Sequence, residues 1–417
     1  MNRKTAPIHP GPALLGGLAC LGLSAVIYRF WAGIGAVSNL TDGHPWGFWV
    51  AIDILAGVAL AAGGFVTAGL VYIFGGKRFA ELARPAVLTA FLGYVMFVLG
   101  LIVDMGRPWH MLYIFVGNHN SPLYEIGWCA SLYTLVLALE LLPPVFEKYS
   151  MDAAQRLWRS LSPWLVIVLL SVFTLAMTYS WIWLAIVASL LLAWEILMRK
   201  GVMGRQRQTP ILLIASGVML SFLHQSSLGS LYLMTAHSLN PLWHSPLLPI
   251  MFLISAIAAG MAMVALESLA GERFLGHKAP FSPLVDMARI VPVLLIIYLV
   301  MKAGDILPYG DWRGLLSLNL QSFMWWVEMG AGVAAPLILY LTPGFVQKRS
   351  GLALASGLVV GGLIINRVNV AVIGLQVQRW QSYYPHPLEI LITMGIVSAG
   401  LLTYAWASAN LPIHTRE

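Results

Sequence analysis

The sequence predicts an all-α integral membrane protein, a polytopic bundle of ten or more transmembrane helices. Of the 417 residues, 59% are hydrophobic and only 10% are charged, whereas a soluble domain carries about 25% charged residues. Apolar stretches of roughly 20 residues recur along the chain, each long enough to cross a ~30 Å hydrocarbon core. Lys and Arg lie mainly between these stretches, so the net charge of +7 does not indicate nucleic acid as a partner.

Ten stretches are predicted to cross the membrane as helices. They lie near 12–36, 46–75, 84–106, 124–146, 210–232, 247–270, 288–304, 319–341, 351–375 and 387–410. The first continues well beyond a signal-peptide core without a clear cleavage site, so we interpret it as a span. A further apolar block, 163–198, is too long for one straight helix and short for two. It forms either a tight hairpin of two short or tilted helices or a partly interfacial helix pair.

Basic residues gather in alternate loops and set the predicted orientation. They follow the second, fourth, sixth and eighth spans: Lys77, Arg78, Arg84, Lys148, Arg156, Arg159, Arg273, Lys278, Arg289, Lys348 and Arg349. The positive-inside rule makes these loops cytoplasmic, together with the N-terminus, where Arg3 and Lys4 precede the first span. The opposite, periplasmic loops hold most of the histidines, so we expect the functional site at that face.

The cysteines and histidines limit which redox groups the chain can hold. Cys20 and Cys129 both lie in apolar spans, and an iron–sulfur cluster needs about four thiolates. A b-type haem needs axial histidines that face each other deep in the membrane, and only His224 lies close to that depth. We therefore expect no metal site, no haem and no iron–sulfur cluster in this chain.

Asp53 is the first of several carboxylates predicted inside the membrane. A charge at the bilayer centre costs roughly 2.5 kcal/mol or more, so such residues usually face the protein interior and have a function. Gly57, Ala61 and Gly64 share one helical face with Asp53, and small residues mark close helix packing. Asp53 should point into the protein, either as a proton carrier or as a structural hydrogen-bond acceptor.

Glu125 and Glu140 lie at opposite ends of the fourth span. Their separation of 15 residues leaves them only about 60° apart around a helix. Together they could mark both ends of a proton route along one helix. The alternatives are interfacial solvation for Glu125 and a side chain that snorkels to the surface for Glu140.

Three further charged residues are candidates for the same route. Glu328 lies too deep in the eighth span to snorkel easily, and Glu267 lies near the cytoplasmic end of the sixth. Arg367 lies between Asn366 and Asn369 and needs an acidic partner, for which Asp53 and Glu328 are the candidates. A structural ion pair explains Arg367 as well as a functional one.

Two periplasmic groups suit quinone chemistry. His224 and Gln225 begin the densest polar run at the end of an apolar helix, and both side chains can hydrogen-bond a quinone carbonyl. Histidine also titrates near neutral pH. Asp104 and Arg107, one turn apart, would add a carboxylate and a fixed charge. The alternatives are a histidine hydrogen-bonded in a loop and ordinary capping of a helix end.

Short motifs that follow one another along nearly the whole chain resemble those of a known family. They are Asp42-Gly43-His44-Pro45-Trp46-Gly47 with Asp53 and Gly63-Gly64, Asp104-Met105-Gly106-Arg107, Tyr124-Glu125 with Ala138-Leu139-Glu140, His224-Gln225-Ser226-Ser227-Leu228-Gly229-Ser230, and Tyr384-Pro385 with Glu389. Through them the sequence resembles the NrfD/PsrC-like membrane subunits. It is most similar to the HybB-like and QrcD-like branch of periplasmic uptake hydrogenases and of the quinone reductase complex of sulfate reducers.

The resemblance implies a single membrane domain, 1–417, built from two four-helix bundles. The first covers approximately 40–232 with the inserted hairpin 163–198, the second approximately 247–375, and 12–36 and 387–410 are peripheral helices. It implies a quinone site near the periplasmic surface at His44, Trp46, Asp104, Arg107, His224 and Gln225. Glu125, His224 and Asp104 become the candidate catalytic residues. The proton path would use Asp53, Glu125, Glu140, Glu267, Glu328 and Arg367.

The resemblance also implies partners. A periplasmic ferredoxin-like iron–sulfur subunit would exchange electrons with menaquinone, or another quinone, in a bacterial inner membrane. A hydrogenase, a molybdopterin-type enzyme or a multihaem cytochrome c would complete the complex. Two other functions stay open from the sequence: a secondary ion transporter, which predicts broken helices at mid-membrane, and a purely structural membrane anchor.

Overall fold

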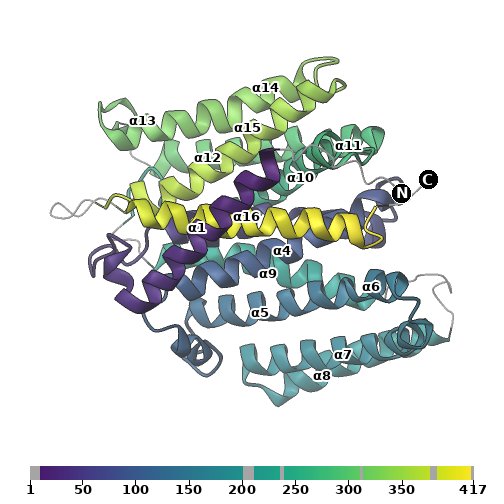
Figure 1. Cartoon of the computed structure of the whole chain (residues 1–417). Coiled ribbons are helices and arrows are strands. Elements are labelled where there is room, and N and C mark those ends of the chain that lie inside the picture. Colours follow the sequence, from purple (N-terminus) through teal and green to yellow (C-terminus); the bar gives the residue numbers. More distant parts are fainter. Residues whose placement is uncertain (1–9, 201–210, 235–238, 310–312, 376–382, 415–417) are drawn as a thin grey trace.

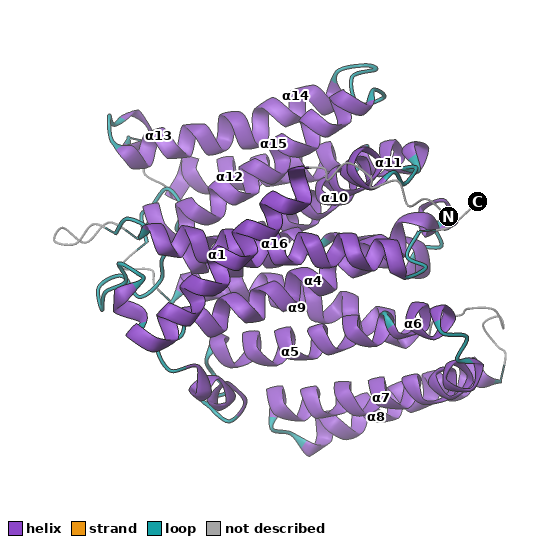
Figure 2. Ribbon diagram, viewed as in Figure 1, coloured by secondary structure: helices purple, strands orange, loops and turns teal. Residues whose placement is uncertain are grey.

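The computed structural model describes residues 10–200, 211–234, 239–309, 313–375 and 383–414. Apart from one isolated bridge between Thr41 and His44, every regular element within these ranges is helical. Figure 2 shows the helices lying side by side, joined by short loops at both ends. Arg3 and Lys4, on which part of the predicted orientation rests, lie outside the described residues.

Eleven helical segments in the described ranges are long and apolar enough to cross a membrane, and each of the ten predicted spans is among them. Six consist of a single helix: α1 (Pro10–Ala32), α4 (Ala80–Asp104), α7 (Asp152–Thr178), α9 (Ile211–Leu233), α10 (Leu248–Leu275) and α16 (Pro387–Asn410). Two consist of paired helices: α5 (Pro122–Glu140) with α6 (Leu142–Lys148), and α11 (Phe281–Ala288) with α12 (Val291–Tyr309). The other three contain wide, π-helical turns. The first is formed by η2 (Val50–Ala56), α2 (Gly57–Leu60), α3 (Gly63–Ala68) and η3 (Gly69–Ile73), in which η2 and η3 are the wide turns. The second is formed by α13 (Leu320–Val327), the wide turn η7 (Glu328–Ala334) and α14 (Ala335–Leu341), and the third by α15 (Arg349–Val368) and the wide turn η8 (Asn369–Ile373).

The eleventh segment, α7, forms the first half of the 163–198 block. This block is a helical hairpin in which α7 is followed at once by α8 (Trp181–Arg199), and the two helices lie side by side in Figure 1. Tyr179 makes the turn in a left-handed conformation with φ 51°. Helix α7 begins at Asp152 instead of near 163 because the polar residues before Pro163 are also helical. The hairpin therefore has room for two helices.

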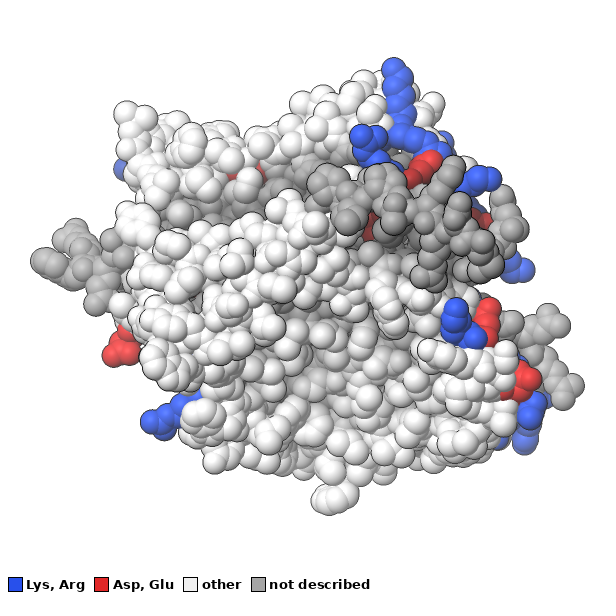
Figure 3. Space-filling view, viewed as in Figure 1, with Lys and Arg blue, Asp and Glu red and all other residues white. Residues whose placement is uncertain are grey.

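Charges on the surface separate the two ends of the molecule. Figure 3 shows Lys and Arg gathered over one end, while a broad band across the middle carries hardly any charge. We call the first the basic end; Lys77, Arg84 and Arg349 lie there. The opposite end, where His44 precedes η2 and His386 precedes α16, is called the histidine end. The pattern confirms a polytopic integral membrane protein.

Helix α4 crosses from the basic end to the histidine end and organises the structure around it. It packs against α2 and α3, α5 and α16, while α9 packs against both α5 and α10. Helix α10 in turn contacts α12 and α15. The division into two four-helix bundles stays a prediction, because α10 also packs closely against α3 and α9.

Helices α1 and α16 cross with their backbones in contact. A Cβ atom at Gly22 would lie 2.5 Å from the Cα atom of Gly395, so only glycine fits this crossing. Figure 1 shows α1 running obliquely over α16. Ala25 and Arg29 follow Gly22 on the same face of α1, at three and seven residues further on. The crossing therefore directs Arg29 toward the interior of the protein.

Two of the predicted intramembrane acids lie in wide helical turns. Asp53 is in η2 and Glu328 is in η7, and both segments are π-helical. Such turns are rare and occur frequently at functional sites. The backbone continues as a helix on both sides of each turn, so these spans are bulged and not broken.

Candidate functional site

Two loops meet at the histidine end through the carboxylate of Glu389. It is fully buried and accepts hydrogen bonds from the backbone N–H groups of Asn39 at 3.0 Å and His386 at 3.1 Å. The hydroxyl of Tyr383 also donates to it, while that hydroxyl accepts from the N–H of Phe48 at 2.8 Å. The segment before α16 is thereby fixed against the segment before η2.

His44 lies in this junction with its ring stacked on Tyr383, 6.5 Å between centroids. It is 3% exposed, and neither ring nitrogen has a hydrogen-bond partner among the described residues. Burial, followed by the hydrogen bond to Glu389, raises the pKa of the Tyr383 phenol well above its usual range. Trp46 packs against Tyr232 at 5.3 Å. Buried polar atoms normally have partners, so both ring nitrogens of His44 are free to form hydrogen bonds that the described residues do not supply.

Asp104 ends α4 beside this junction. Its carboxylate interacts electrostatically with those of Glu389 and Asp53, and its Oδ1 atom is buried without a partner among the described residues. Arg29 from α1 supplies the nearby positive charge. The Arg29 guanidinium donates to the carbonyl oxygens of Val103, at 2.8 Å, and Met105 at the end of α4. This buried arginine complements the negative end of the helix dipole.

Arg107, predicted as the fixed charge, lies on the exposed surface of the following loop. It immediately precedes the 3₁₀ segment η5 (Pro108–Phe115). Arg29 therefore occupies the interior position near Asp104, and a quinone contact by Arg107 stays a prediction.

Asp53 points into the protein, as predicted from the small residues on its face. It is 6% exposed, and the hydroxyl of Thr393 on α16 donates to its Oδ2 atom at 2.7 Å. Gly100 of α4 packs directly against it, since a Cβ atom there would lie 2.7 Å from the Asp53 Cβ. The carboxylate therefore lies one turn of α4 below Asp104.

His224 lies in the middle of α9, and the prediction that it ends an apolar helix is wrong. The helix continues to Leu233 because the following serines bond to their own helix: Ser226, Ser227 and Ser230 each donate to a carbonyl of the preceding turn. The His224 ring is fully buried between Tyr94 and Phe97, with centroids 5.6 and 5.7 Å apart.

The position of His224 can be measured along α4. Phe97 precedes Asp104 by seven residues, so His224 lies about 10 Å deeper than Asp104. The neighbouring Gln225 donates to the carbonyl of Val58 at 3.0 Å. The two residues thus sit below the junction that holds His44, not within it.

Glu125 occupies the first turn of α5 and is half-buried. The His224 ring lies beside the backbone of Ile126, the next residue, but outside strict hydrogen-bond geometry. Two of the candidate catalytic residues, Glu125 and His224, therefore lie at neighbouring positions on α5 and α9.

Glu140, at the other end of α5, borders a cavity of about 350 Å³ at the basic end. We call this cavity the vestibule. Its charged lining consists of Lys77, Arg84, Glu140, Glu147 and Arg159. Arg84 pairs with Glu147 at 3.1 Å, and Trp158 of α7 lines the cavity too. Glu140 makes no hydrogen bond that fixes it within the described structure.

Glu267 lies apart from these groups. The hydroxyl of Tyr404 on α16 donates to its carboxylate at 2.5 Å. It lines neither the vestibule nor the small cavity beside Glu328. Its predicted part in a proton path has no support from its surroundings.

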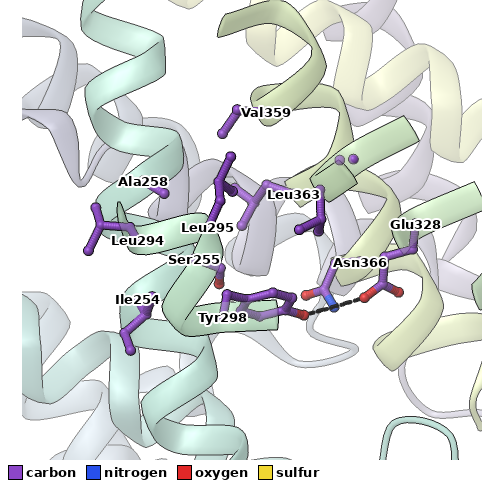
Figure 4. A pocket seen from close by; sticks show the side chains of 13 residues that line it. Ile254, Ser255, Ala258, Leu294, Leu295, Tyr298, Glu328, Val359, Leu363 and Asn366 are labelled. Carbon is purple, nitrogen blue, oxygen red and sulfur yellow. Dashed lines mark hydrogen bonds between the residues drawn. The ribbon is translucent and has the colours of Figure 1, made fainter. Parts of the chain in front are cut away.

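Glu328 is held by four donors inside a second polar cluster. It accepts from Trp243 Nε1 at 2.9 Å, from the amides of Asn366 and Asn369 at 2.8 Å each, and from the Tyr298 hydroxyl at 3.4 Å. Figure 4 shows the Tyr298–Asn366–Glu328 contacts at the edge of a cavity of about 30 Å³. A cavity of this size holds a water molecule.

Arg367 makes no direct ion pair, and the prediction of one is wrong. Within the described residues, no carboxylate lies within 4 Å of its guanidinium. It donates instead to Asn366 Oδ1 at 2.5 Å, Ser255 Oγ at 3.0 Å and the Phe252 carbonyl at 3.2 Å. Neutral acceptors surround it, and Asp53 bonds to α16 instead.

Several residues of the site carry no distinctive signal in the sequence. Arg29, Tyr94 and Tyr383 look like ordinary residues of spans or loops, and only the fold brings them to the candidate groups. Glu389 is part of the Tyr384-Pro385 motif, but the sequence does not include it among the predicted site residues. In the parts of the chain that the structure describes, no group of three or more His, Cys, Asp or Glu residues could hold a metal ion.

Comparison with known proteins identifies the family. Residues 36–378 match the family described as "Polysulphide reductase, NrfD". The chain is 33% identical to a protein of Nitratidesulfovibrio vulgaris over 99% of this chain and 96% of that protein. It is 27% identical to the probable Ni/Fe-hydrogenase 2 b-type cytochrome subunit of Escherichia coli, over 96% of this chain and 91% of that subunit.

A third relative is the integral membrane subunit of menaquinone reductase from Nitratidesulfovibrio vulgaris. The chain is 24% identical to it, over 95% of this chain and 89% of that subunit. The match to the NrfD family covers more than half of the chain and includes His44, Asp104, the vestibule and the Glu328 cluster, while Arg29, Tyr383 and Glu389 lie outside the matched residues. The chain therefore belongs to the NrfD polysulphide reductase family of integral membrane proteins.

Proposed function

We propose that this chain is the quinone-reactive membrane subunit of a respiratory oxidoreductase complex. A quinone, in the first place menaquinone, binds at the histidine end near His44 and Asp104. It takes two electrons and two protons and leaves as quinol. The electrons come from a ferredoxin-like iron–sulfur subunit seated on that end, which is periplasmic in a bacterial inner membrane. The N-terminus is cytoplasmic.

One observation carries the proposal: buried polar atoms without partners converge at the histidine end. The His44 ring and Asp104 Oδ1 are the atoms concerned. A quinone carbonyl needs a hydrogen-bond donor, which imidazole or a protonated carboxyl group supplies. The membrane subunit of menaquinone reductase among the relatives supports the choice of quinone. These residues therefore fit the substrate.

The remaining residues receive roles from their positions. Tyr383 and Glu389 fix the loop that carries His44, and Arg29 holds the end of α4 that carries Asp104. Trp46 borders the quinone, Gln225 lies deeper against the Val58 carbonyl, and Arg107 faces the partner subunit. Glu125, His224 and Asp53 deliver protons to the site from within the membrane. The chain is not active alone, because it depends on electrons from its partners.

The further catalytic subunit is a hydrogenase, a molybdopterin-type enzyme or a multihaem cytochrome c. The Escherichia coli relative named as a hydrogenase subunit supports the first of these. Copurification from the native membrane would identify it.

The test uses membranes that contain the whole complex and the partner's own electron donor. Asp104→Asn and His44→Gln should each lower quinone reduction by about 100-fold. Asp42→Asn and His110→Gln are matched controls, because both residues are exposed at the same end. Near-normal rates in both site variants would overturn the site assignment, and a wild-type complex that reduces no quinone would overturn the function.

A further inference from the structure

A row of buried polar groups lies between the vestibule and His224. The hydroxyls of Tyr94, Tyr133 and Ser221 and both nitrogens of His224 are buried without hydrogen-bond partners among the described residues. Native proteins leave few such groups unpaired, and several in a row require bound water. The row is therefore a line of polar groups that can each bind water or a neighbouring hydroxyl group within an otherwise apolar helix bundle.

The members of this row touch one another in order. The rings of Tyr133 and Tyr94 meet edge to face with centroids 4.7 Å apart, and Tyr94 meets His224 at 5.6 Å. Both tyrosine hydroxyls approach Ser221, although strict hydrogen-bond geometry is not reached. Ser221 and His224 are one turn apart on α9, so they share one face of that helix.

Gly217 of α9 joins this row to the vestibule. A Cβ atom at Gly217 would lie 3.5 Å from Glu140 Oε1 and 3.5 Å from the Tyr133 ring. Glu140 lines the vestibule from the other side. The vestibule, Glu140 and the Tyr133 ring are thus contiguous, and solvent at the basic end reaches the start of the row.

Helix α4 gives the length of the row. Val87 lines the vestibule, Tyr94 touches the middle of the row and Phe97 touches His224. Gly100, one turn further, packs against Asp53. From Val87 to Asp104 the rise is about 25 Å, and the row covers roughly the first half. It ends one turn of α4 below Asp53.

The second polar cluster offers no such route. Both oxygens of Glu328 are engaged by donors from four residues. A proton could reach this carboxylate only if one of these four hydrogen bonds were broken. Its adjoining cavity, about 30 Å³, is far smaller than the vestibule.

We propose that the row is the route by which the quinone site takes up protons from the basic end of the protein. The groups that carry them are, in order, Glu140, Tyr133, Ser221, Tyr94 and His224. Water in the vestibule supplies the proton, which passes between hydroxyl groups and bound waters, and His224 passes it on toward Asp53. The inference rests on the proposed quinone function and assigns it a proton source on the opposite side of the membrane.

The experiment uses the whole complex in liposomes and records quinone reduction and membrane potential together. Ser221→Ala and Tyr133→Phe remove only a hydroxyl that has no partner, so folding should be kept and is checked by assembly of the complex. We expect both variants to lose potential per quinone reduced. Ser356→Ala is the matched control, because Ser356 bonds to Tyr340 as a buried pair in the other half of the chain.

The outcomes separate the two proposals. A wild-type complex that reduces no quinone overturns the proposed function. Quinone reduction without any potential in the wild type leaves that function standing and overturns the route. The route is also overturned if Ser221→Ala and Tyr133→Phe generate the same membrane potential per quinone reduced as the wild type. Loss of potential in these two variants and not in Ser356→Ala supports it.

Discussion

Glu328 and Arg367 lie in one buried cluster but are joined only through Asn366. The Asn366 carbonyl oxygen accepts from Arg367 at 2.5 Å, and its amide donates to Glu328 at 2.8 Å. The two opposite charges are therefore linked by a neutral side chain that bonds to both. This arrangement fixes both oxygens of Glu328 and both terminal nitrogens of Arg367 with neutral partners, so it stabilises the helix packing and does not need to move a proton.

The Asn366 bridge leads to a prediction for stability. Asn366→Leu would remove one bond from each of two buried charged groups, which should cost about 2 kcal/mol or more. Thermal unfolding of the detergent-purified complex should show a lower midpoint. Asn410→Leu is the control, because Asn410 is exposed at the end of α16. Equal midpoints for the two variants would mean that the bridge does not stabilise the cluster.

Arg29 should be needed to hold the end of α4. Arg29→Met leaves the Val103 and Met105 carbonyls without their donor and removes the positive charge near Asp104. We expect quinone reduction to fall by about tenfold. Arg29→Lys should restore little, because an ammonium group lacks the planar fork of donors. Normal turnover in Arg29→Met, with Arg349→Met as the exposed control, would contradict this role.

The contact between Gly22 and Gly395 should also be needed for quinone reduction, because it holds Arg29 against the end of α4. Gly22→Ala would place a methyl group 2.5 Å from the Gly395 backbone, so α1 must move away from α16 and take Arg29 with it. Quinone reduction should then fall as in Arg29→Met. Gly17→Ala is the matched control on the same helix, because nothing lies within 4 Å of its added Cβ. Equal activity of the two alanine variants would show that the crossing does not position Arg29.

The segment after α16 should detach from the basic end in acid. His414 stacks on His277 at 4.2 Å, and Arg84 donates to the Pro412 carbonyl at 2.8 Å. Burial, followed by the nearby His277, lowers the pKa of His414 from 6.5 to about 4. Between these values only the detached segment binds the proton, so docking weakens as the pH falls.

Limited proteolysis should detect this change. Cleavage near the C-terminus should become faster from pH 7 to pH 5 in the wild type. His414→Gln should show a weaker pH dependence because it cannot take up the proton. Cleavage that is independent of pH in the wild type would contradict the assignment.

The sequence predicts the spans well because apolar length and loop charge report directly on the membrane. It also predicts the inward direction of Asp53 from the small residues on its face. It places His224 too near the end of the span at 210–232, because the serines that follow it are equally typical of loops. His224 therefore appears near a surface in the sequence but is fully buried within a spanning helix in the structure.

The parts of the site that the sequence misses depend on helix packing. Nothing in the first span indicates that Arg29 reaches across to α4, because this depends on the crossing of two glycines 373 positions apart, at 22 and 395. An ion pair for Arg367 is the natural expectation from charge alone. In the structure Asn366 bonds to both charged groups instead. The sequence cannot predict this bridge, because it depends on how the neighbouring helices pack.

The most direct test of the account is to locate the bound quinone with a photoreactive quinone analogue. Irradiation of the whole complex followed by peptide mapping should place the label on residues around His44, the end of α4 and Tyr383. Excess native quinone should prevent that labelling, and Asp104→Asn should reduce it. Two results would contradict a quinone site at the histidine end. One is specific labelling confined to the cluster around Glu328, and the other is labelling that excess native quinone does not prevent.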